Sequence, residues 1–128
     1  MEEPEHLSEA DLELIRGIVE RTKADNAREA VQIALRLDAA RALARDLASS
    51  LSGYPQVRRV FFFGSASTGR DFRLDSDIDL AVEGGDILSH RALVEVAPIP
   101  VDVVDFLALP PLLREGIESE GELLYEKR

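Results

Sequence analysis

The hydrophobic pattern of this 128-residue chain changes its period at about residue 54, and no other feature constrains the fold as strongly. Residues 1–53 contain no strand-like run and carry apolar residues at helical spacing. From residue 54 onward, short β-branched and aromatic runs alternate with turn signals and helical stretches. The sequence therefore predicts a mixed α/β (α+β) domain with flanking helices, preceded by a helical segment.

Two helices, packed as a hairpin, are predicted before residue 54. The first begins at Ser8, and Asp11 stands three positions later as the second half of a capping box. The second begins at Asn26, has Glu29 in the capping-box position and ends at Gly53. These signals divide the helical segment into two elements of different length.

The second predicted helix is apolar on more than one side. Its main stripe consists of Ile33, Leu37, Ala40, Ala44, Leu47 and Leu51. A helix with such a wide apolar surface usually packs against two neighbours. The second helix entry, at Asn26, is the boundary between an N-terminal helical extension, residues 1–25, and a main domain, residues 26–128. The extension is predicted to serve association, either with a protein partner or with a second copy of the chain in a homo-oligomer.

Strands and helices then alternate through the main domain. Strands are predicted over residues 57–63, 77–83 and 100–106, a loop over 66–76, a helix over 88–96, a last helix from Pro110–Pro111 to Gly121, and an edge strand over 123–125. This order of elements is typical of a mixed sheet with helices packed against it.

Composition excludes several classes of protein. Twenty-five acidic against fifteen basic residues give a net charge of -10, which disfavours direct nucleic-acid binding because phosphate backbones are repelled. Cysteine is absent, so a disulfide scaffold, a thiol nucleophile and a thiolate metal site are excluded. No stretch approaches ~18 uninterrupted apolar residues, so no membrane span is expected. We expect a cytoplasmic protein.

Two carboxylates on one predicted strand carry the first chemical signal. In Asp77-Ile78-Asp79 the pleat of a strand points both aspartates to one face and Ile78 to the other. Two such carboxylates repel each other unless a cation or water holds them. Oxygen ligands of this kind select hard divalent ions, above all Mg²⁺ when phosphates complete the coordination shell.

A third carboxylate is expected from a neighbouring strand. The segment Val101–Phe106 offers Asp102 and Asp105, which are three residues apart and therefore face opposite sides. Only one of them can join Asp77 and Asp79; we favour Asp102, with Asp105 as the alternative. The three carboxylates are predicted to converge within a few ångströms at a shallow acidic cleft beside Gly64-Ser65, and the pKa of at least one is predicted to be raised.

A glycine-serine turn supplies the second chemical signal. Gly64-Ser65 follows a predicted strand, where backbone N–H groups and a hydroxyl are free to bind phosphate and glycine permits a close approach. A phosphate cradle beside paired carboxylates predicts metal-assisted transfer from a nucleoside triphosphate. The serine-hydrolase, P-loop and Rossmann motifs are all absent from the chain. A phosphate-accepting receiver domain is a weaker alternative, because no lysine lies between Lys23 and Lys127.

Residues 57–126 resemble the minimal nucleotidyltransferases of the polymerase-beta-like superfamily. The hallmark of that family, Gly-Ser followed about ten residues later by Asp-x-Asp, stands here as FFFGSASTGRDFRLDSDIDLAVE. The segment PVDVVDF is similar to the strand that carries the family's third carboxylate, and PPLLREGIESEGELLYEKR is similar to its closing helix and edge strand.

The resemblance implies a role for each matched residue. Gly64 and Ser65 would bind the triphosphate of ATP, Asp77 and Asp79 would ligate two Mg²⁺ ions, and Asp102 would bind the catalytic ion and activate the acceptor hydroxyl. Many members of the family are antitoxins paired with HEPN-domain toxins, so the resemblance implies AMP transfer from ATP to a hydroxyl of a HEPN-domain partner.

The chain departs from the family pattern in the turn. Two arginines that often follow Gly-Ser in the family are replaced here by Ala66 and Thr68, and Arg70 or Arg73 would have to substitute for them. This departure favours a rival function, in which a catalytically weak or inactive module neutralises its partner by contact. The intact set of carboxylates favours the enzyme.

Overall fold

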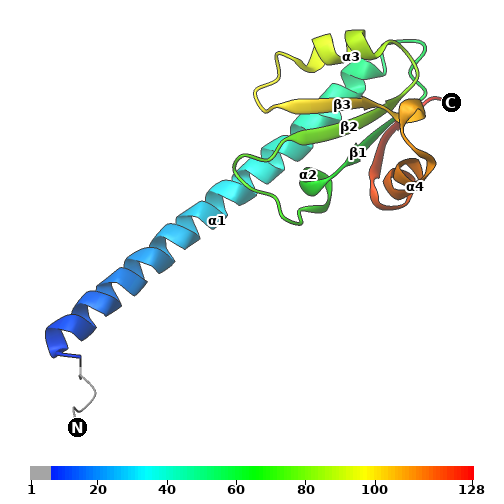
Figure 1. The fold of residues 1–128 in the computed structure, drawn as a ribbon. Coiled ribbons are helices and arrows are strands. Elements are labelled where there is room, and N and C mark those ends of the chain that lie inside the picture. The colour runs from blue at the N-terminus through cyan, green and yellow to red at the C-terminus, as the bar shows by residue number, and fades with distance from the viewer. Residues whose placement is uncertain (1–6) are drawn as a thin grey trace.

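A computed structural model describes residues 7–128 of the chain. The elements, in chain order, are α1 (Glu9–Leu51), β1 (Arg59–Phe63), α2 (Ser65–Thr68), β2 (Ile78–Glu83), α3 (Ile87–Val94), β3 (Val101–Asp105), the 3-10 helix η1 (Phe106–Ala108), α4 (Pro111–Glu120) and β4 (Glu122–Glu126). The C-terminal half of α1 lies against the sheet, and its N-terminal half projects away from it (Figure 1). The predicted α+β fold with a helical N-terminal segment is confirmed.

Helix α1 is one continuous helix, so the predicted helical hairpin is wrong. The predicted start is confirmed, because the Ser8 hydroxyl accepts a hydrogen bond from the Asp11 N–H at 3.1 Å and Asp11 accepts one from the Ser8 N–H at 3.2 Å. No second helix begins at Asn26: the helix passes through it without a glycine or proline between residues 18 and 51, and alanine is frequent on both sides. A capping residue acts only where the preceding chain is not helical. The boundary drawn after residue 25 falls inside this helix and stays a prediction.

The four strands form one mixed sheet in the order β3-β2-β1-β4. Strand β1 is antiparallel to both β2 and β4, whereas β2 and β3 are parallel and are joined through α3. The register places Asp79 of β2 between Phe63 of β1 and Asp102 of β3. Carboxylates far apart in the sequence therefore lie on adjacent strands.

Each face of the sheet has its own apolar cluster. On one face, the C-terminal half of α1 and helix α3 bury alternate strand residues, among them Val60, Phe62, Ile78, Leu80, Val82 and Val103. On the other face, η1 and α4 cover a smaller cluster made by Phe61, Ala81, Phe106 and Ile117. Asp79 alternates with Ile78 and Leu80, so its side chain belongs to this second, less fully covered face.

The segment after β1 differs from its prediction. Residues 66–76 were expected to form a loop, but Ser65–Thr68 forms a single helical turn, α2, with the fully buried Ala66 inside it. Gly64 and Gly69 flank this turn with φ values of 80° and 78°, a backbone conformation that glycine adopts without strain. The other predicted strands and helices are confirmed to within two residues at each end.

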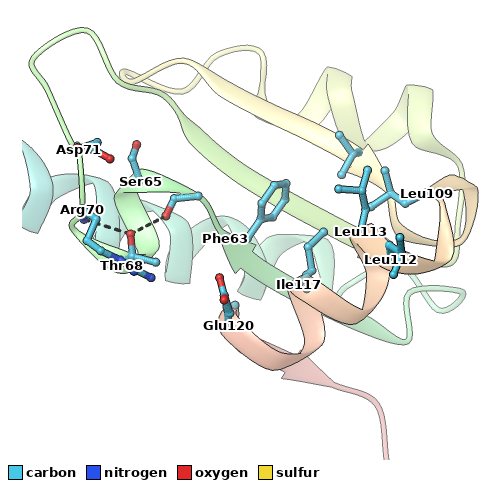
Figure 2. A pocket seen from close by; sticks show the side chains of 14 residues that line it. Phe63, Ser65, Thr68, Arg70, Asp71, Leu109, Leu112, Leu113, Ile117 and Glu120 are labelled. Atoms are coloured by element: carbon cyan, nitrogen blue, oxygen red, sulfur yellow. Dashed lines mark hydrogen bonds between the residues drawn. The ribbon is translucent and has the colours of Figure 1, made fainter.

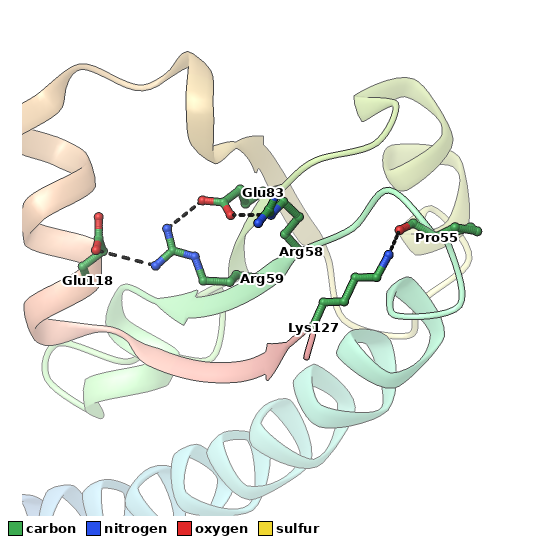
Figure 3. Close-up of polar contacts among 6 residues, drawn as sticks. All are labelled: Pro55, Arg58, Arg59, Glu83, Glu118 and Lys127. Atoms are coloured by element: carbon green, nitrogen blue, oxygen red, sulfur yellow. Dashed lines mark hydrogen bonds and ion pairs between the residues drawn. The ribbon is translucent and has the colours of Figure 1, made fainter.

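Charged side chains fix α4 against the sheet (Figure 3). The Arg59 guanidinium donates a hydrogen bond to Glu83 at 2.6 Å and lies 3.6 Å from Glu118 of α4. Its carbon is also 4.9 Å from the centre of the Phe61 ring, within cation–π range. The hydrogen bond to Glu83 raises the pKa of Arg59 above its usual value, so the guanidinium stays charged. These contacts hold α4 beside the face that carries Asp79.

Candidate active site

The glycine-serine turn connects β1 to the site directly. Gly64 is the N-cap of α2 and has positive φ, and a Cβ at this position would overlap the Oδ2 atom of Asp79. The Gly64 carbonyl accepts hydrogen bonds from the N–H groups of Ser67 and Thr68, both at 3.1 Å. The first N–H groups of a helical turn have no partner within the turn, and Ser65, unlike the fully buried Ala66, is partly exposed, so the Ser65 N–H is available to an anion. The close approach at Gly64 brings this turn against a carboxylate.

The other predicted carboxylates lie around Asp79. Asp77 is exposed just before β2, and Asp102 is exposed on β3 at the register position next to Asp79. Asp105 lies opposite Val82, farther along the strand, and its carboxylate caps η1 by accepting a hydrogen bond from the Leu107 N–H at 3.2 Å. The geometry therefore favours Asp102 over Asp105 as the third carboxylate of the site, and its role in catalysis stays a prediction.

The neighbouring carboxylates affect the pKa of Asp79. Three causes together raise the pKa of Asp79 to about 6: burial first, then the negative charge of Asp102 and that of Asp77. The predicted raised pKa is thus confirmed for one of the three carboxyl groups. A carboxyl group in this position favours either a proton or a cation near it.

The three carboxylates do not converge as tightly as predicted. Within residues 7–128, no group of three or more histidine, cysteine, aspartate or glutamate side chains is close enough to hold a metal ion as the side chains stand. Like charges repel, and the exposed side chains of Asp77 and Asp102 are free to point away from Asp79. The donor set still suits Mg²⁺, because it consists of carboxylate oxygens beside a turn that accepts anions.

A pocket of about 640 Å³ opens beside the turn (Figure 2). Gly64, Ser65, Thr68 and Arg70 line one side, and its opposite wall is apolar and formed by Leu109, Leu112, Leu113 and Ile117 from the η1–α4 region. Asp77, Asp79 and Asp102 do not line it, so the acidic cleft predicted at this place is instead an apolar-walled pocket with the carboxylates outside it. The cause is α4, which packs on the same sheet face as Asp79.

The two loop arginines differ in position. Arg70 lines the pocket beside Ser65 and Thr68, and its backbone N–H donates a hydrogen bond to the Thr68 hydroxyl at 3.1 Å (Figure 2). Arg73 is exposed and does not line the pocket; its backbone N–H bonds to the Ser76 hydroxyl at 2.8 Å. Arg70 is therefore the better placed of the two to meet a phosphate.

Sequence reasoning missed two arginines of α1 that contact the site. Arg41 donates hydrogen bonds to the carbonyls of Ala66 and Ser67, and Arg36 donates one to the carbonyl of Ser76. The available signal was their position at the edge of the apolar stripe of α1, where a charged residue needs a polar partner once the helix packs.

We expect the raised pKa of Asp79 to appear as a dependence of stability on pH. In the folded protein the carboxyl titrates at about 6, above its ordinary 3.8, so the folded state binds the proton more tightly. The stability that protonation of Asp79 confers is fully present below pH 3.8, the ordinary pKa, and is lost as the pH rises through about 6. In thermal melts of metal-free protein between pH 4.5 and 7.5, the melting temperature of Asp79→Asn should exceed that of the parent by an amount that grows with pH. A constant difference across this range contradicts the prediction.

Comparison with known proteins decides the family. The family model "Polymerase beta, Nucleotidyltransferase" matches residues 45–128, which is well over half of the chain. The chain belongs to the polymerase-beta nucleotidyltransferase family. The match contains the glycine-serine turn and all three aspartates of the candidate site, and it begins inside α1, so Arg36 and Arg41 precede it.

Three solved structures are similar to this chain. A protein described as a minimal nucleotidyltransferase is 34% identical to this nucleotidyltransferase, with a TM-score of 0.54 over 67% of this chain and 93% of that one. A crystal structure of a toxin–antitoxin complex with AMP-PNP contains a chain that is 26% identical, with a TM-score of 0.53 over 66% and 74% of the two chains. A chain of a tri-AMPylated Shewanella oneidensis HEPN toxin in complex with its MNT antitoxin is 23% identical, with a TM-score of 0.48 over 66% and 71%.

Two further findings concern this nucleotidyltransferase. No curated protein matches it significantly. Among the helices of residues 7–128, none combines the length and the apolar character that crossing a membrane requires.

Proposed function

We propose that this protein is a Mg²⁺-dependent nucleotidyltransferase that transfers AMP from ATP to a hydroxyl of a protein partner, breaking the bond between the α- and β-phosphates and releasing pyrophosphate. One observation carries the proposal: the Gly64 turn packs against the carboxylate of Asp79, which lies beside Asp102 in the sheet register. An anion-binding turn and paired carboxylates are the two parts that phosphoryl-group chemistry with a metal requires. The family match supports the same class of reaction.

The residues of the site divide the work between them. The backbone N–H and the hydroxyl of Ser65, at the start of α2, bind the triphosphate, with Arg70 beside them. Asp77, Asp79 and Asp102 would hold two Mg²⁺ ions, which, when bound, neutralise charge on the triphosphate. Asp102 is exposed at the edge of the site, where it can accept the proton of the acceptor hydroxyl.

The proposed partner is a HEPN-domain toxin, which makes this protein the antitoxin of the pair. The Gly-Ser and Asp-x-Asp motifs resemble those of antitoxins of this type. Further support comes from the similar chain in a toxin–antitoxin complex that holds AMP-PNP, a nucleotide of the class proposed here.

A second function, neutralisation by contact alone, is favoured by one specific observation. Ala66 and Thr68 stand where the family often has arginines, and Ala66 is fully buried inside α2, so it cannot reach a phosphate. With weaker triphosphate binding, the domain would keep its fold and block its partner without modifying it.

A transfer assay separates the two functions. The purified partner is incubated with this protein, Mg²⁺ and ATP, and its mass is measured; the enzyme predicts an increase by whole AMP units that depends on both ATP and Mg²⁺. The same partner is then assayed for toxicity with Asp77→Asn. Inhibition that is untouched by this change, together with no mass increase, would establish the contact mechanism and reject AMP transfer.

We also propose that the projecting half of α1 is an association surface. Leu12, Ile15 and Val19 are each 44% exposed on one side of the helix, and residues 9–32 contribute no buried side chain to the domain. An isolated helix of this kind gains most of its stability from packing of its apolar side. The site residues lie on the sheet and on α2, away from this segment.

Deleting residues 1–25 is expected to alter association and leave the domain folded. Residues 7–25, the described part of the deleted segment, contain none of the buried core residues, whereas each half-exposed apolar side chain that is removed is worth about 1 kcal/mol when covered by a partner. Light scattering should show a changed oligomeric state, or titration should show weaker binding to the protein partner by about tenfold or more. Binding of Mg·ATP should be retained. Unchanged mass and unchanged partner affinity would reject the association role.

A further inference from the structure

Arg41 of α1 donates hydrogen bonds to the backbone of the glycine-serine turn. The Arg41 Nε donates a hydrogen bond to the Ala66 carbonyl at 3.2 Å, and its Nη2 donates one to the Ser67 carbonyl at 3.3 Å. Both carbonyls belong to α2, and a Cβ on Gly69 would lie 3.2 Å from the same Nη2. The guanidinium is therefore packed against the turn whose Ser65 and Thr68 line the pocket.

A second arginine holds the other end of the same loop. The Arg36 Nη2 donates a hydrogen bond at 2.9 Å to the Ser76 carbonyl, which belongs to the peptide bond between Ser76 and Asp77. Its Nε is buried, with no hydrogen-bond partner among residues 7–128, so the guanidinium has a single polar anchor there. The Arg36 side chain is only partly buried, and its hydrogen bond to Ser76 ties the backbone next to Asp77 to α1.

We propose that Arg41 and Arg36 are positioning residues, which set the triphosphate turn and the Asp77 carboxylate at a fixed separation. The inference rests on the proposed function, and it assigns a role to residues that precede the family match. The two arginines are five positions apart in the helix, about 7.5 Å along a rigid axis. The intervening chain, 69–75, is mostly exposed. A rigid helix thus ties both ends of a loop that otherwise has few buried side chains.

The two anchors should affect different steps. Arg41 acts on α2, so its loss should weaken binding of the triphosphate; Arg36 acts next to Asp77, so its loss should weaken the response to the metal. Arginine suits the first task because its planar fork reaches two consecutive carbonyls, whereas a lysine supplies one compact charge. Small displacements of binding groups reduce rates strongly even when the mutated residue does not touch substrate.

The test compares Arg41→Met, Arg36→Met and Arg41→Lys with the matched control Arg45→Met, which changes an exposed arginine of the same helix. For Arg41→Met we expect KM for Mg·ATP to rise by about tenfold or more with a smaller change in kcat, and for Arg41→Lys a partial recovery. For Arg36→Met we expect a fall in kcat and a higher Mg²⁺ concentration for half-maximal activity. The proposal would be overturned if both methionine variants showed the same changes in kcat and KM, or if they behaved like the control.

A second readout does not depend on activity. Amide hydrogen exchange should become faster at residues 67–69 in Arg41→Met and at residues 76–78 in Arg36→Met, with Arg45→Met unchanged at both. If the parent protein transfers no AMP and binds no Mg·ATP, the proposed function fails, and the exchange pattern still decides the positioning role. Exchange at both segments that equals the control would reject it.

Discussion

Replacing Asp79 by asparagine should abolish nucleotidyl transfer while leaving the fold intact. Asp79 is the most buried of the three carboxylates, packs against Gly64 and lies beside Asp102, so its charge is central to any metal bound there. In the proposed mechanism Asp79 is a ligand to the metal, and its loss removes several kcal/mol of transition-state stabilisation, which corresponds to a fall of about 10³-fold or more in rate. The Mg·ATP-induced rise in melting temperature should disappear as well.

The same substitution should raise the stability of the metal-free protein. Asparagine keeps the size of the side chain and removes its charge. In the parent, burial of that charge and its repulsion by Asp102 and Asp77 raise the pKa of Asp79 to about 6. The relief is on the order of 1 kcal/mol at neutral pH once solvent screening is allowed for. A gain in stability with a loss of activity is characteristic of a residue retained for function.

Melting curves with and without Mg·ATP, beside a radiolabelled transfer assay, measure both effects. Asp105→Asn is the matched control, because Asp105 is an aspartate of the neighbouring strand that caps η1 and lies away from Asp79. Asparagine also caps helices, so this control should change stability and transfer little. Transfer at the parental rate by Asp79→Asn would refute the assignment of Asp79 to the metal.

Replacing Gly64 by alanine is the second change for which we expect a large effect. Gly64 has a φ of 80°, which alanine adopts only with strain, and the added Cβ would overlap the Oδ2 of Asp79. Strain of this kind costs about 1–3 kcal/mol, and the overlap forces either the turn or the carboxylate to move. We therefore expect a lower melting temperature together with the loss of Mg·ATP binding.

Gly17→Ala is the control for this experiment. A Cβ at Gly17 meets no atom within 4 Å, and the residue lies inside the projecting half of α1. Alanine in the interior of an exposed helix is favoured over glycine by up to about 1 kcal/mol, so this variant should be slightly more stable. Calorimetry and nucleotide titration of the two variants separate a general effect of alanine from the effect at the turn. Nucleotide binding by Gly64→Ala at parental affinity would contradict the proposed contact between the turn and the triphosphate.

The sequence by itself determined the elements of the domain and the order of its chemical groups. Period-two alternation predicted which side Asp79 takes on β2, and the Gly-Ser turn after β1 needed only a local backbone preference. The capping box at Ser8 is also local, because it involves only residues three positions apart. The long α1 was misread at Asn26 because a capping residue looks the same whether or not a helix already precedes it.

The tertiary structure alone decided how these elements combine into a site. Sheet order and parallel pairing put Asp102, rather than Asp105, beside Asp79, and no local signal in β3 distinguishes the two. Packing of α4 on the same face produced an apolar pocket where the sequence predicted an acidic cleft. Arg41 and Arg36 bond to loop carbonyls that lie 25 and 40 residues later in the chain, so these contacts depend on how α1 packs against the sheet. Such contacts depend on distances between elements, and a periodic pattern records only the direction in which each side chain points.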